Sequence, residues 1–405
     1  MNIAKQELEQ QAVADGGFPA VDWVARAKEI APLVEAAGER IESERRIPQD
    51  VMSALHDGEI FRMCLPHFLG GGEAKPLTVM LAVEAIAAAD ASTAWCLGQG
   101  LGCSRTAAFL DPGVAREVFG KPDAIVAWGP PGGKNQAVAV DGGYRLTGKW
   151  RLASGIPNAT WVGPNCPVYE PDGTPRLDAN GKPVLRNMLL PISSAEVTDV
   201  WQVIGLRGTG SNSFAIDDLF VPEEFTFVRD SAADRREDNW LYHMPLTTFY
   251  GIAFAGVALG VARTMLGSFI RLAADKIPSH NTTVMRENPG VQREVARAEA
   301  NLGSARSYLI DMINTVWESD KMPKEWPLED RARLRIACTN AVNQARDTAA
   351  FAYQSAGSTS IFENQDFERR FRDINTVAQQ AQGQPVNLEH AGMALLGIER
   401  QGGRV

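Results

Sequence analysis

The spacing of apolar residues changes twice along the chain. From about residue 21 to residue 121, apolar side chains recur every three or four positions, which predicts helices. From about residue 123 to residue 229 the apolar runs are short and end in turn signals, which predicts strands. The helical spacing returns from residue 247. We therefore predict a mainly α protein with an inserted β domain, divided into residues 1–122, 123–229 and 230–405.

One segment of the β domain, residues 142–161, combines strand, turn and aromatic signals. Within it, residues 149–153 end in Ser154 and Gly155, where a hydroxyl group lies beside a residue that readily adopts positive φ. Trp150 and Trp161 flank this corner. Aromatic rings, a hydroxyl group and bare backbone suit a flat heteroaromatic ligand. A core tryptophan beside a glycine turn would give the same pattern, so both interpretations stay open.

The third domain is predicted to contain long, closely packed helices. Residues 291–316 place apolar side chains alternately four and three positions apart, which is typical of antiparallel helix packing, and Pro289 opens this helix. A second helix spans residues 328–356 and stops at Gly357. The most apolar run, residues 249–262, is too short to cross a membrane and is rich in Gly and Ala. We therefore expect it to be a buried helix.

Composition narrows the classes of function. The 405 residues exceed what one hydrophobic core usually serves, and 49 acidic against 40 basic residues give a net charge of −9. This charge disfavours nucleic acid or a membrane surface as a partner. The five cysteines and five histidines have neither disulfide nor metal-ligand spacing, so we expect no metal site. The first eleven residues are polar and unlike a signal peptide, which favours a soluble, cytoplasmic protein.

Three motifs resemble the acyl-CoA dehydrogenase superfamily. Residues 143–150, GYRLTGKW, closing on Ser154, resemble its flavin-contacting segment. Residues 205–211, GLRGTGS, resemble the start of the strand that leaves the β domain, and a strand after these glycines excludes a dinucleotide-binding helix. Residues 370–373, RFRD, resemble the late helix near the active site. The resemblance extends over roughly residues 21–397.

The resemblance implies an acyl-CoA dehydrogenase-like fold: an N-terminal helical domain, a central β-sandwich or barrel, and a C-terminal four-helix bundle. It places Ser154 and Gly155 at the N5 edge of a flavin, Trp150 beside the flavin ring, and Trp128 near the substrate. Arg372 of the late motif is also expected to contact the cofactor. In this family a neighbouring subunit's bundle helps to hold the flavin, which implies a homotetramer.

Two branches of the superfamily were compared with this chain. Its dehydrogenases remove a substrate proton with a glutamate, which lies after the late motif or at the start of the third domain's first long helix. Residues 377–382 read VAQQAQ, and the second location falls near Tyr250, so neither place holds a carboxylate. Residues 371–376, FRDINT, resemble the two-component flavin monooxygenases. Those enzymes use O2 and reduced flavin, FADH2 or FMNH2, from a separate reductase to hydroxylate small aromatic compounds.

Gln380 occupies the place where many of these monooxygenases have a histidine. Glutamine donates a hydrogen bond but does not titrate, so we interpret Gln380 and Ser154 as catalytic groups for a substrate that needs no deprotonation. The resemblance thus favours a monooxygenase of a small aromatic or heteroaromatic compound. The alternatives are an FAD-dependent acyl-CoA dehydrogenase and a flavin-free binding protein with the same fold.

Overall fold

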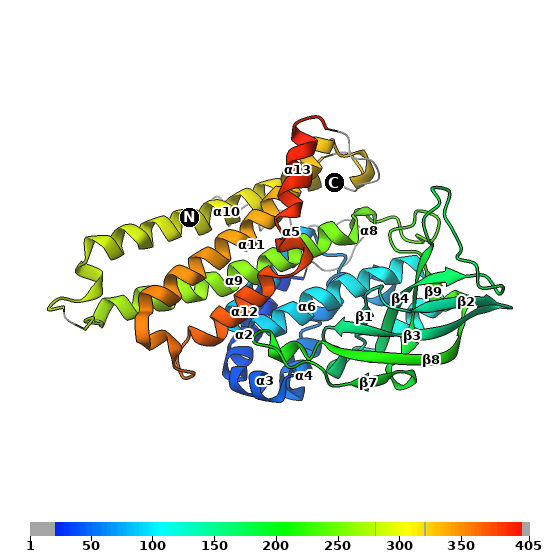
Figure 1. The fold of residues 1–405 in the computed structure, drawn as a ribbon, viewed down its shortest axis with the longest axis horizontal. Coiled ribbons are helices and arrows are strands. Elements are labelled where there is room, and N and C mark those ends of the chain that lie inside the picture. Colours follow the sequence, from blue (N-terminus) through cyan, green and yellow to red (C-terminus); the bar gives the residue numbers. More distant parts are fainter. Residues whose placement is uncertain (1–20, 280, 320, 399–405) are drawn as a thin grey trace.

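The structure is a computed structural model that describes residues 21–279, 281–319 and 321–398. The polar N-terminal segment used above lies outside these residues. The predicted order of helical, β and helical regions is confirmed, with the sheet at one end and the long helices at the other (Figure 1). The helices of the first region are α2 (Trp23–Ala36), α3 (Gly38–Glu44), α4 (Gln49–Asp57), α5 (Pro76–Ala89), α6 (Ala91–Ser104) and α7 (Pro112–Phe119).

The described β region forms a nine-stranded sheet with the strand order β7-β8-β3-β2-β4-β5-β9, and β1 and β6 pair with β4. Its inner face buries a hydrophobic core of its own, which contains Trp150, Phe214 and Tyr144. Gly142 has a φ of 73° at the predicted β2–β3 hairpin turn. The strands are β1 (Val126–Gly129), β2 (Gln136–Val140), β3 (Gly143–Ala153), β4 (Trp161–Tyr169), β5 (Leu185–Met188), β6 (Leu190–Pro191), β7 (Glu196–Thr198), β8 (Asn212–Pro222) and β9 (Thr226–Phe227).

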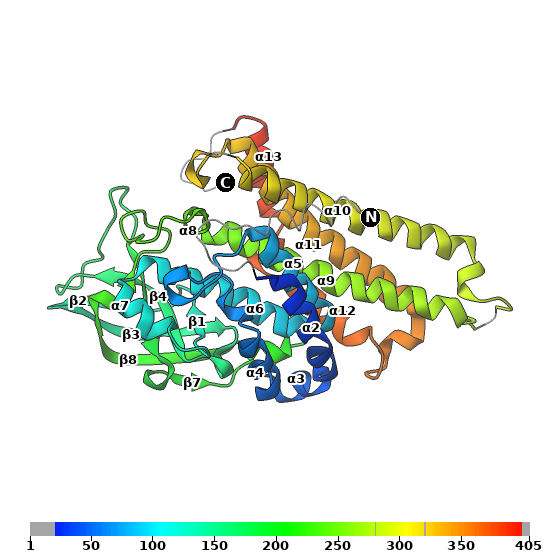
Figure 2. The same cartoon turned by 180° about the vertical axis from the view of Figure 1, so that it is seen from behind.

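Three long helices run side by side in the C-terminal region: α9, α10 and α11 (Figures 1 and 2). The predicted ends of two of them are confirmed, because α10 begins at Pro289 and α11 is followed by Gly357. The helices of this region are α8 (Trp240–His243), α9 (Leu246–Asp275), α10 (Pro289–Trp317), α11 (Leu328–Ala356), α12 (Glu368–Ala378) and α13 (Val386–Leu395).

Helix α9 is the central helix of the molecule. Its 30 residues are enough to cross a membrane, but 83% of its most apolar window is buried inside the protein, as in the core helix of a soluble protein. Gly256 and Gly260 allow close contact with α5, because a Cβ atom would lie 2.7 Å from the Met80 carbonyl oxygen or 2.4 Å from that of Glu84. Helix α6 lies between α9 and the sheet. The active-site candidates gather along this α6 helix.

Candidate active site

A chain of hydroxyl groups connects the end of β3 with the start of β8. Trp95 Nε1 on α6 donates a hydrogen bond to Ser154 Oγ at 3.0 Å, and Ser154 Oγ lies 2.7 Å from Ser211 Oγ. Ser211 Oγ lies 2.7 Å from Thr209 Oγ1, which donates to the Leu206 carbonyl oxygen at 2.8 Å. Ser154 is partly exposed, whereas Ser211 and Thr209 are buried. The exposed end of the chain is therefore Ser154.

The hydrogen bonds give this chain one direction. Thr209 uses its proton on a carbonyl, so it must accept from Ser211, and Ser211 must in turn accept from Ser154. Ser154 accepts from Trp95 and keeps one free lone pair. Gly155 beside it has a φ of 79°, the conformation that its position in the sequence predicts. Ser154 is thus set up to accept one more hydrogen bond.

An aromatic stack runs from this chain along α9. Trp95 stacks on Phe254 with ring centroids 4.1 Å apart, and Phe254 stacks on Tyr250 at 5.3 Å. Phe254 and Tyr250 are four residues apart, so α9 presents them on one face. Gly102 on α6 makes room for Tyr250, because a Cβ atom would lie 2.4 Å from that ring. Trp128 Nε1 donates to Tyr250 Oη at 2.7 Å and closes the far end of the stack.

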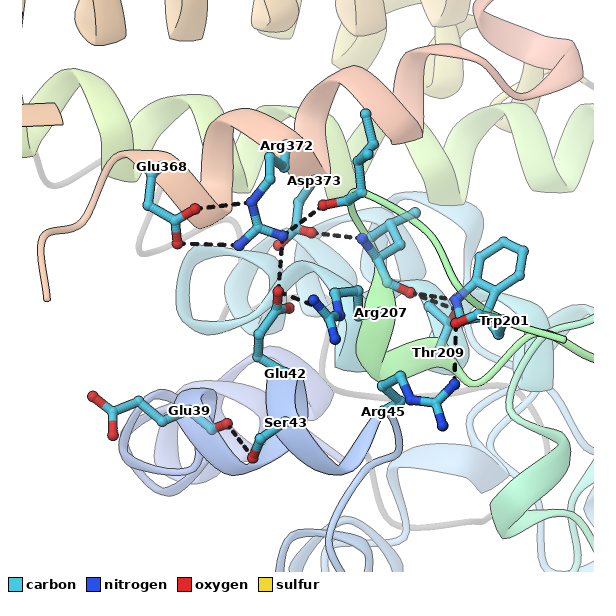
Figure 3. A network of polar contacts seen from close by, with 12 residues as sticks. Glu39, Glu42, Ser43, Arg45, Trp201, Arg207, Thr209, Glu368, Arg372 and Asp373 are labelled. Atoms are coloured by element: carbon cyan, nitrogen blue, oxygen red, sulfur yellow. Dashed lines mark hydrogen bonds and ion pairs between the residues drawn. The ribbon is translucent and has the colours of Figure 1, made fainter. Parts of the chain in front are cut away.

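The loop that carries Thr209 is held against α12. The Asp373 carboxylate accepts a hydrogen bond from the Leu206 backbone N–H at 2.6 Å (Figure 3). Gly205 packs so closely that a Cβ atom would lie 2.3 Å from the Arg372 carbonyl oxygen. Leu206 itself has a φ of 53°, a conformation that non-glycine residues adopt rarely. The position of the hydroxyl chain therefore depends on α12.

Asp373 is buried in this contact. Burial first, and then the charge of the nearby Asp90 carboxylate, raise the pKa of its carboxyl group to about 7. The hydrogen bond from Leu206 and the charge of Arg369 act against this rise. Asp90 is also buried and caps α6, where it accepts from the Thr93 N–H at 2.7 Å. Two carboxyl groups thus lie close together in the core behind the loop.

Arg372 is engaged within the protein. Its Nε and Nη2 donate to Glu368 at 2.8 and 3.1 Å, and Nη1 donates to Glu42 at 2.8 Å and to the Ile204 carbonyl oxygen. Figure 3 shows its guanidinium group between the two carboxylates. All three nitrogens already have protein partners, so Arg372 holds the loop between α3 and α12. A direct contact between Arg372 and a cofactor stays a prediction.

Gln380 has one unused donor at the end of α12. Its Oε1 accepts from the Gln382 N–H at 2.8 Å, whereas its Nε2 is buried and finds no hydrogen-bond partner in the described part of the chain. A cavity of about 460 Å³ opens beside the same stretch of chain, between α12 and the segment before Gly205. Its walls are Gln202, Val203, Ile204, Asn375, Thr376 and Gln379.

Trp150 lies apart from this group. It is 1% exposed, it stacks on Phe214 with centroids 5.3 Å apart, and its Nε1 donates to the Asn165 carbonyl oxygen at 3.0 Å. It therefore fills the core of the β domain, which was the alternative interpretation of this tryptophan, and we leave it out of the proposed site. Trp161 is half-buried and stacks on Phe225.

Three residues of the site were not predicted from the sequence. Thr209 and Ser211 are spaced two apart at the entry to β8, which is the spacing of side chains on one face of a strand. Two hydroxyl residues at this spacing, within the glycine-containing motif of residues 205–211, were a usable sequence signal for the hydroxyl chain. Trp95 lies in an apolar, alanine- and glycine-rich helix and gives no such signal.

The reactive side chains elsewhere do not form a second centre of a familiar kind. Among residues 21–279, 281–319 and 321–398, no three His, Cys, Asp or Glu side chains are grouped so that they could hold a metal ion. The five cysteines are free and buried. Burial raises the pKa of the Cys64, Cys103 and Cys338 thiols to about 12, so they are unreactive at neutral pH.

Comparison with known proteins identifies the family. The model of the acyl-CoA dehydrogenase N-terminal domain matches residues 24–109, and that of the acyl-CoA dehydrogenase C-terminal domain matches residues 252–385. The indole-3-acetate monooxygenase of Pseudomonas putida is 30% identical over 87% of this chain and 88% of its own length. The chain belongs to the acyl-CoA dehydrogenase superfamily.

Within the superfamily, the relatives place this chain in the branch of flavin-dependent monooxygenases, so it is an oxidoreductase. The oxygenase component of the FADH2-dependent resorcinol hydroxylase of Rhizobium sp. (strain MTP-10005) is 27% identical over 95% of this chain and 96% of its own length. The fold is shared with XiaF from Streptomyces sp. in complex with FADH2 and glycerol, with a TM-score of 0.85, 22% identity and 98% coverage of both chains.

Neither place where superfamily dehydrogenases carry their base has a carboxylate here. The hydroxyl group of Tyr250 contacts Trp128 and Cys103 within the described part of the chain. At the other place, Gln380 bonds the backbone of Gln382. Removal of a substrate α-proton needs a positioned base, so this geometry favours oxygenation over dehydrogenation.

Proposed function

We propose that this enzyme is the oxygenase component of a two-component flavin monooxygenase and hydroxylates a small aromatic or heteroaromatic compound. One observation carries the proposal: the hydroxyl chain ends in a partly exposed Ser154 that can accept a further hydrogen bond. Reduced flavin has a hydrogen atom on N5, whereas oxidised flavin has a lone pair there. An acceptor at this place suits FADH2 or FMNH2 better than oxidised flavin.

The residues around Ser154 fit a flavin. Ser154 and Gly155 would face the N5 edge, and the unpaired Gln380 amide is an orphan donor of the kind that a bound ligand satisfies. The cavity beside α12 offers space next to the same loop. When bound, reduced flavin supplies the electrons with which O2 is activated, so that one oxygen atom enters the substrate and the other becomes water.

Each group of this chain has a defined task in the proposal. The Thr209–Ser211–Ser154 chain fixes which way the Ser154 proton points, so Ser154 orients the cofactor without transferring a proton. The Trp128 end of the aromatic stack forms an apolar wall for the substrate ring, which excludes water. Gln380 donates a hydrogen bond to an oxygen atom of the ligand. Arg372 positions the loop.

The setting of the enzyme is part of the proposal. We propose a homotetramer, a separate flavin reductase as partner, a cytoplasmic location and domain boundaries at residues 1–122, 123–229 and 230–405. The boundaries agree with the last helix before the sheet ending at Phe119 and the first strand beginning at Val126. Apolar side chains on α13 support an interface between copies, since Leu395 is 46% exposed and Leu396 78%. Helix α9 is buried within its own chain and does not supply that surface.

The test is a direct assay of the purified chain. We expect it to be colourless as isolated, to bind photoreduced FAD or FMN under anaerobic conditions, and to insert an atom of isotopically labelled O2 into an aromatic probe such as indole-3-acetate. Mass spectrometry of the product measures the label. A protein that carries tightly bound yellow FAD and oxidises an acyl-CoA would contradict the proposal and support the dehydrogenase alternative.

A further inference from the structure

A fully buried arginine lies behind the substrate end of the aromatic stack. Arg105 follows α6, is 2% exposed, and places its guanidinium carbon 4.8 Å from the centre of the Phe249 ring. Its Nη2 donates to the carbonyl oxygens of Leu241 and Met244. Its Nε and Nη1 are buried and have no hydrogen-bond partner among the residues that the structure describes. Buried donors without partners are rare in proteins and call for an explanation.

A second arginine approaches the same place from the end of the β domain. The guanidinium carbon of Arg229 lies 4.8 Å from the centre of the Trp128 ring, and its Nε is also buried without a partner. Both cations act on the phenol of Tyr250 through their charges. The buried Arg105 and the partly exposed Arg229 therefore both lie near Tyr250, which accepts the hydrogen bond from Trp128.

Within the described part of the chain, the positive charge of Arg105 is only partly compensated. Asp230 is the carboxylate that acts most strongly on Arg105, and its oxygens also accept from the Leu246 N–H at 3.2 and 3.3 Å. The neighbouring Cys64 thiol is uncharged, because burial raises its pKa to about 12. Among the described residues, Asp230 is thus the carboxylate that faces Arg105, which lies in a region of low dielectric constant, where an incompletely paired charge is costly. A bound anion would supply the missing partner.

We infer that Arg105 and Arg229 bind the acidic group of the substrate, so that the substrate class is an aromatic carboxylic acid. This inference rests on the proposed function and sharpens it. The ring of the acid lies against Trp128 and Tyr250, and its carboxylate satisfies the unpaired nitrogens of the two arginines. Charge-assisted hydrogen bonds are about twice as strong as neutral ones, so the acid is distinguished from a neutral compound of the same shape.

The experiment compares acids with their amides, which have nearly the same shape but no charge. The full-length protein is first titrated anaerobically with FADH2. The loaded enzyme is then titrated by calorimetry with indole-3-acetate and indole-3-acetamide, and with phenylacetate and phenylacetamide. We expect each acid to bind about ten- to a hundredfold more tightly than its amide.

Variants assign the difference to the two arginines. Arg229→Gln, at a partly exposed position, should reduce the acid-to-amide ratio at least about fivefold and leave the affinity for the amides within about twofold. Arg105→Lys keeps the buried charge but not the guanidinium shape and should also reduce the ratio. Arg263→Gln, which removes an exposed ion pair between α9 and Glu299 on α10, should keep the wild-type ratio.

Acid and amide of equal affinity in the wild-type enzyme, or no binding of either acid, would overturn the inference and leave the proposed function standing if FADH2 binds. An acid-to-amide ratio that survives in both arginine variants would overturn the assignment to Arg105 and Arg229. Failure of FADH2 to bind would overturn the proposed function, and this inference with it.

Discussion

Ser154 is useful to a reduced cofactor because its own proton is already committed. Its hydroxyl group donates to Ser211, so only a lone pair is available to a ligand. A lone hydroxyl group could turn and serve either redox state of a flavin. If Ser154 contacts the flavin as proposed, the residues behind it should decide which redox state binds more tightly.

Ser211→Ala should weaken this preference. The change removes the acceptor for the Ser154 proton, so the hydroxyl group can turn to donate, and the ratio of Kd values for oxidised and reduced flavin should fall about two- to tenfold, the equivalent of one neutral hydrogen bond. Ser154→Ala should remove the same 0.5–1.5 kcal/mol, about one hydrogen bond, from the binding of reduced flavin. Anaerobic fluorescence titration measures both constants.

The matched control is Ser213→Ala, a buried serine two residues further along β8 and outside the hydroxyl chain. It should keep the wild-type ratio. If the Ser211→Ala enzyme had an unchanged ratio, the direction of the hydrogen bonds in the hydroxyl chain would have no influence on flavin binding.

Gln380→Glu isolates the unpaired amide donor. Glutamate has the same length and keeps an oxygen acceptor for the Gln382 N–H, but the donor is lost. If the amide donates to a ligand oxygen, the rate of hydroxylation should fall by about 1–3 kcal/mol of transition-state free energy, while the thermal midpoint changes little. Single-turnover kinetics with pre-reduced flavin give the rate. Full activity of this variant would limit Gln380 to capping the following turn.

How well the site residues could be predicted depended on their local signals. Ser154 and Gly155 lie in a turn whose chemistry is local, and Gly155 has the positive φ expected for it. Trp150 has the same local signals, yet its ring packs on Phe214 in the core of the β domain. Trp95 belongs to the site because it meets Ser154, 59 residues away in the sequence. A contact between residues so far apart cannot be predicted from the local pattern of one sequence.

The loop before β8 is an element whose shape is imposed from outside. Leu206 is tied to Asp373, 167 residues further along the chain. Arg45, after α3, holds the same loop through Asp199 and through the Trp201 carbonyl oxygen, and Figure 3 shows the contact with Trp201. The sequence predicted a strand after the glycines and missed these anchors, because both come from distant helices.

Asp373→Asn should change how stability depends on pH. The pKa of Asp373 is raised from 3.8 to about 7 in the folded state, so between these values the folded protein holds a proton that the unfolded chain has released. Its contribution to stability is fully present below about pH 4 and is lost as the pH rises to about 7, by roughly 1.4 kcal/mol per pH unit. Asparagine keeps an acceptor for Leu206 and does not titrate.

We therefore expect the stability of Asp373→Asn relative to wild type to increase from pH 5 to pH 7. Urea unfolding at several pH values measures this difference, and Glu363→Gln, an exposed carboxylate shortly before α12, is the control. A difference that does not vary with pH would place the pKa of Asp373 outside this window.

The helices were predicted best where their ends have strong local signals. Pro289 opens α10, and Gly357, with a φ of 60°, follows α11. Helix α9 is longer than its apolar run, because exposed side chains such as Arg263 and Arg271 continue the helix along its outer face. An apolar run marks the buried part of a helix and does not fix its end.

The whole molecule should assemble through its C-terminal region. If α13 forms a contact between copies, light scattering at micromolar protein concentration should give the mass of a tetramer. Leu396→Glu should lower that mass, because it places a charge on a side chain that is 78% exposed in the single chain. Leu177→Glu, on a β-domain excursion, is the control with 52% exposure. A monomeric wild-type protein would contradict the proposed assembly.

Helix α6 also sets the distance between the two ends of the candidate site. Trp95 meets Ser154 and Gly102 meets Tyr250, seven residues and two helical turns apart, so the two ends of the site are separated by about 10 Å of helix axis. A rigid helix cannot adjust this spacing to the ligand. If the substrate is an aromatic acid bound as inferred above, the length of the spacer between ring and carboxylate should select the carbon atom that is oxidised. Arylacetates, arylpropionates and arylbutyrates should accordingly differ in regiochemistry more than in affinity. Product analysis across that series would measure how the position of oxidation depends on spacer length.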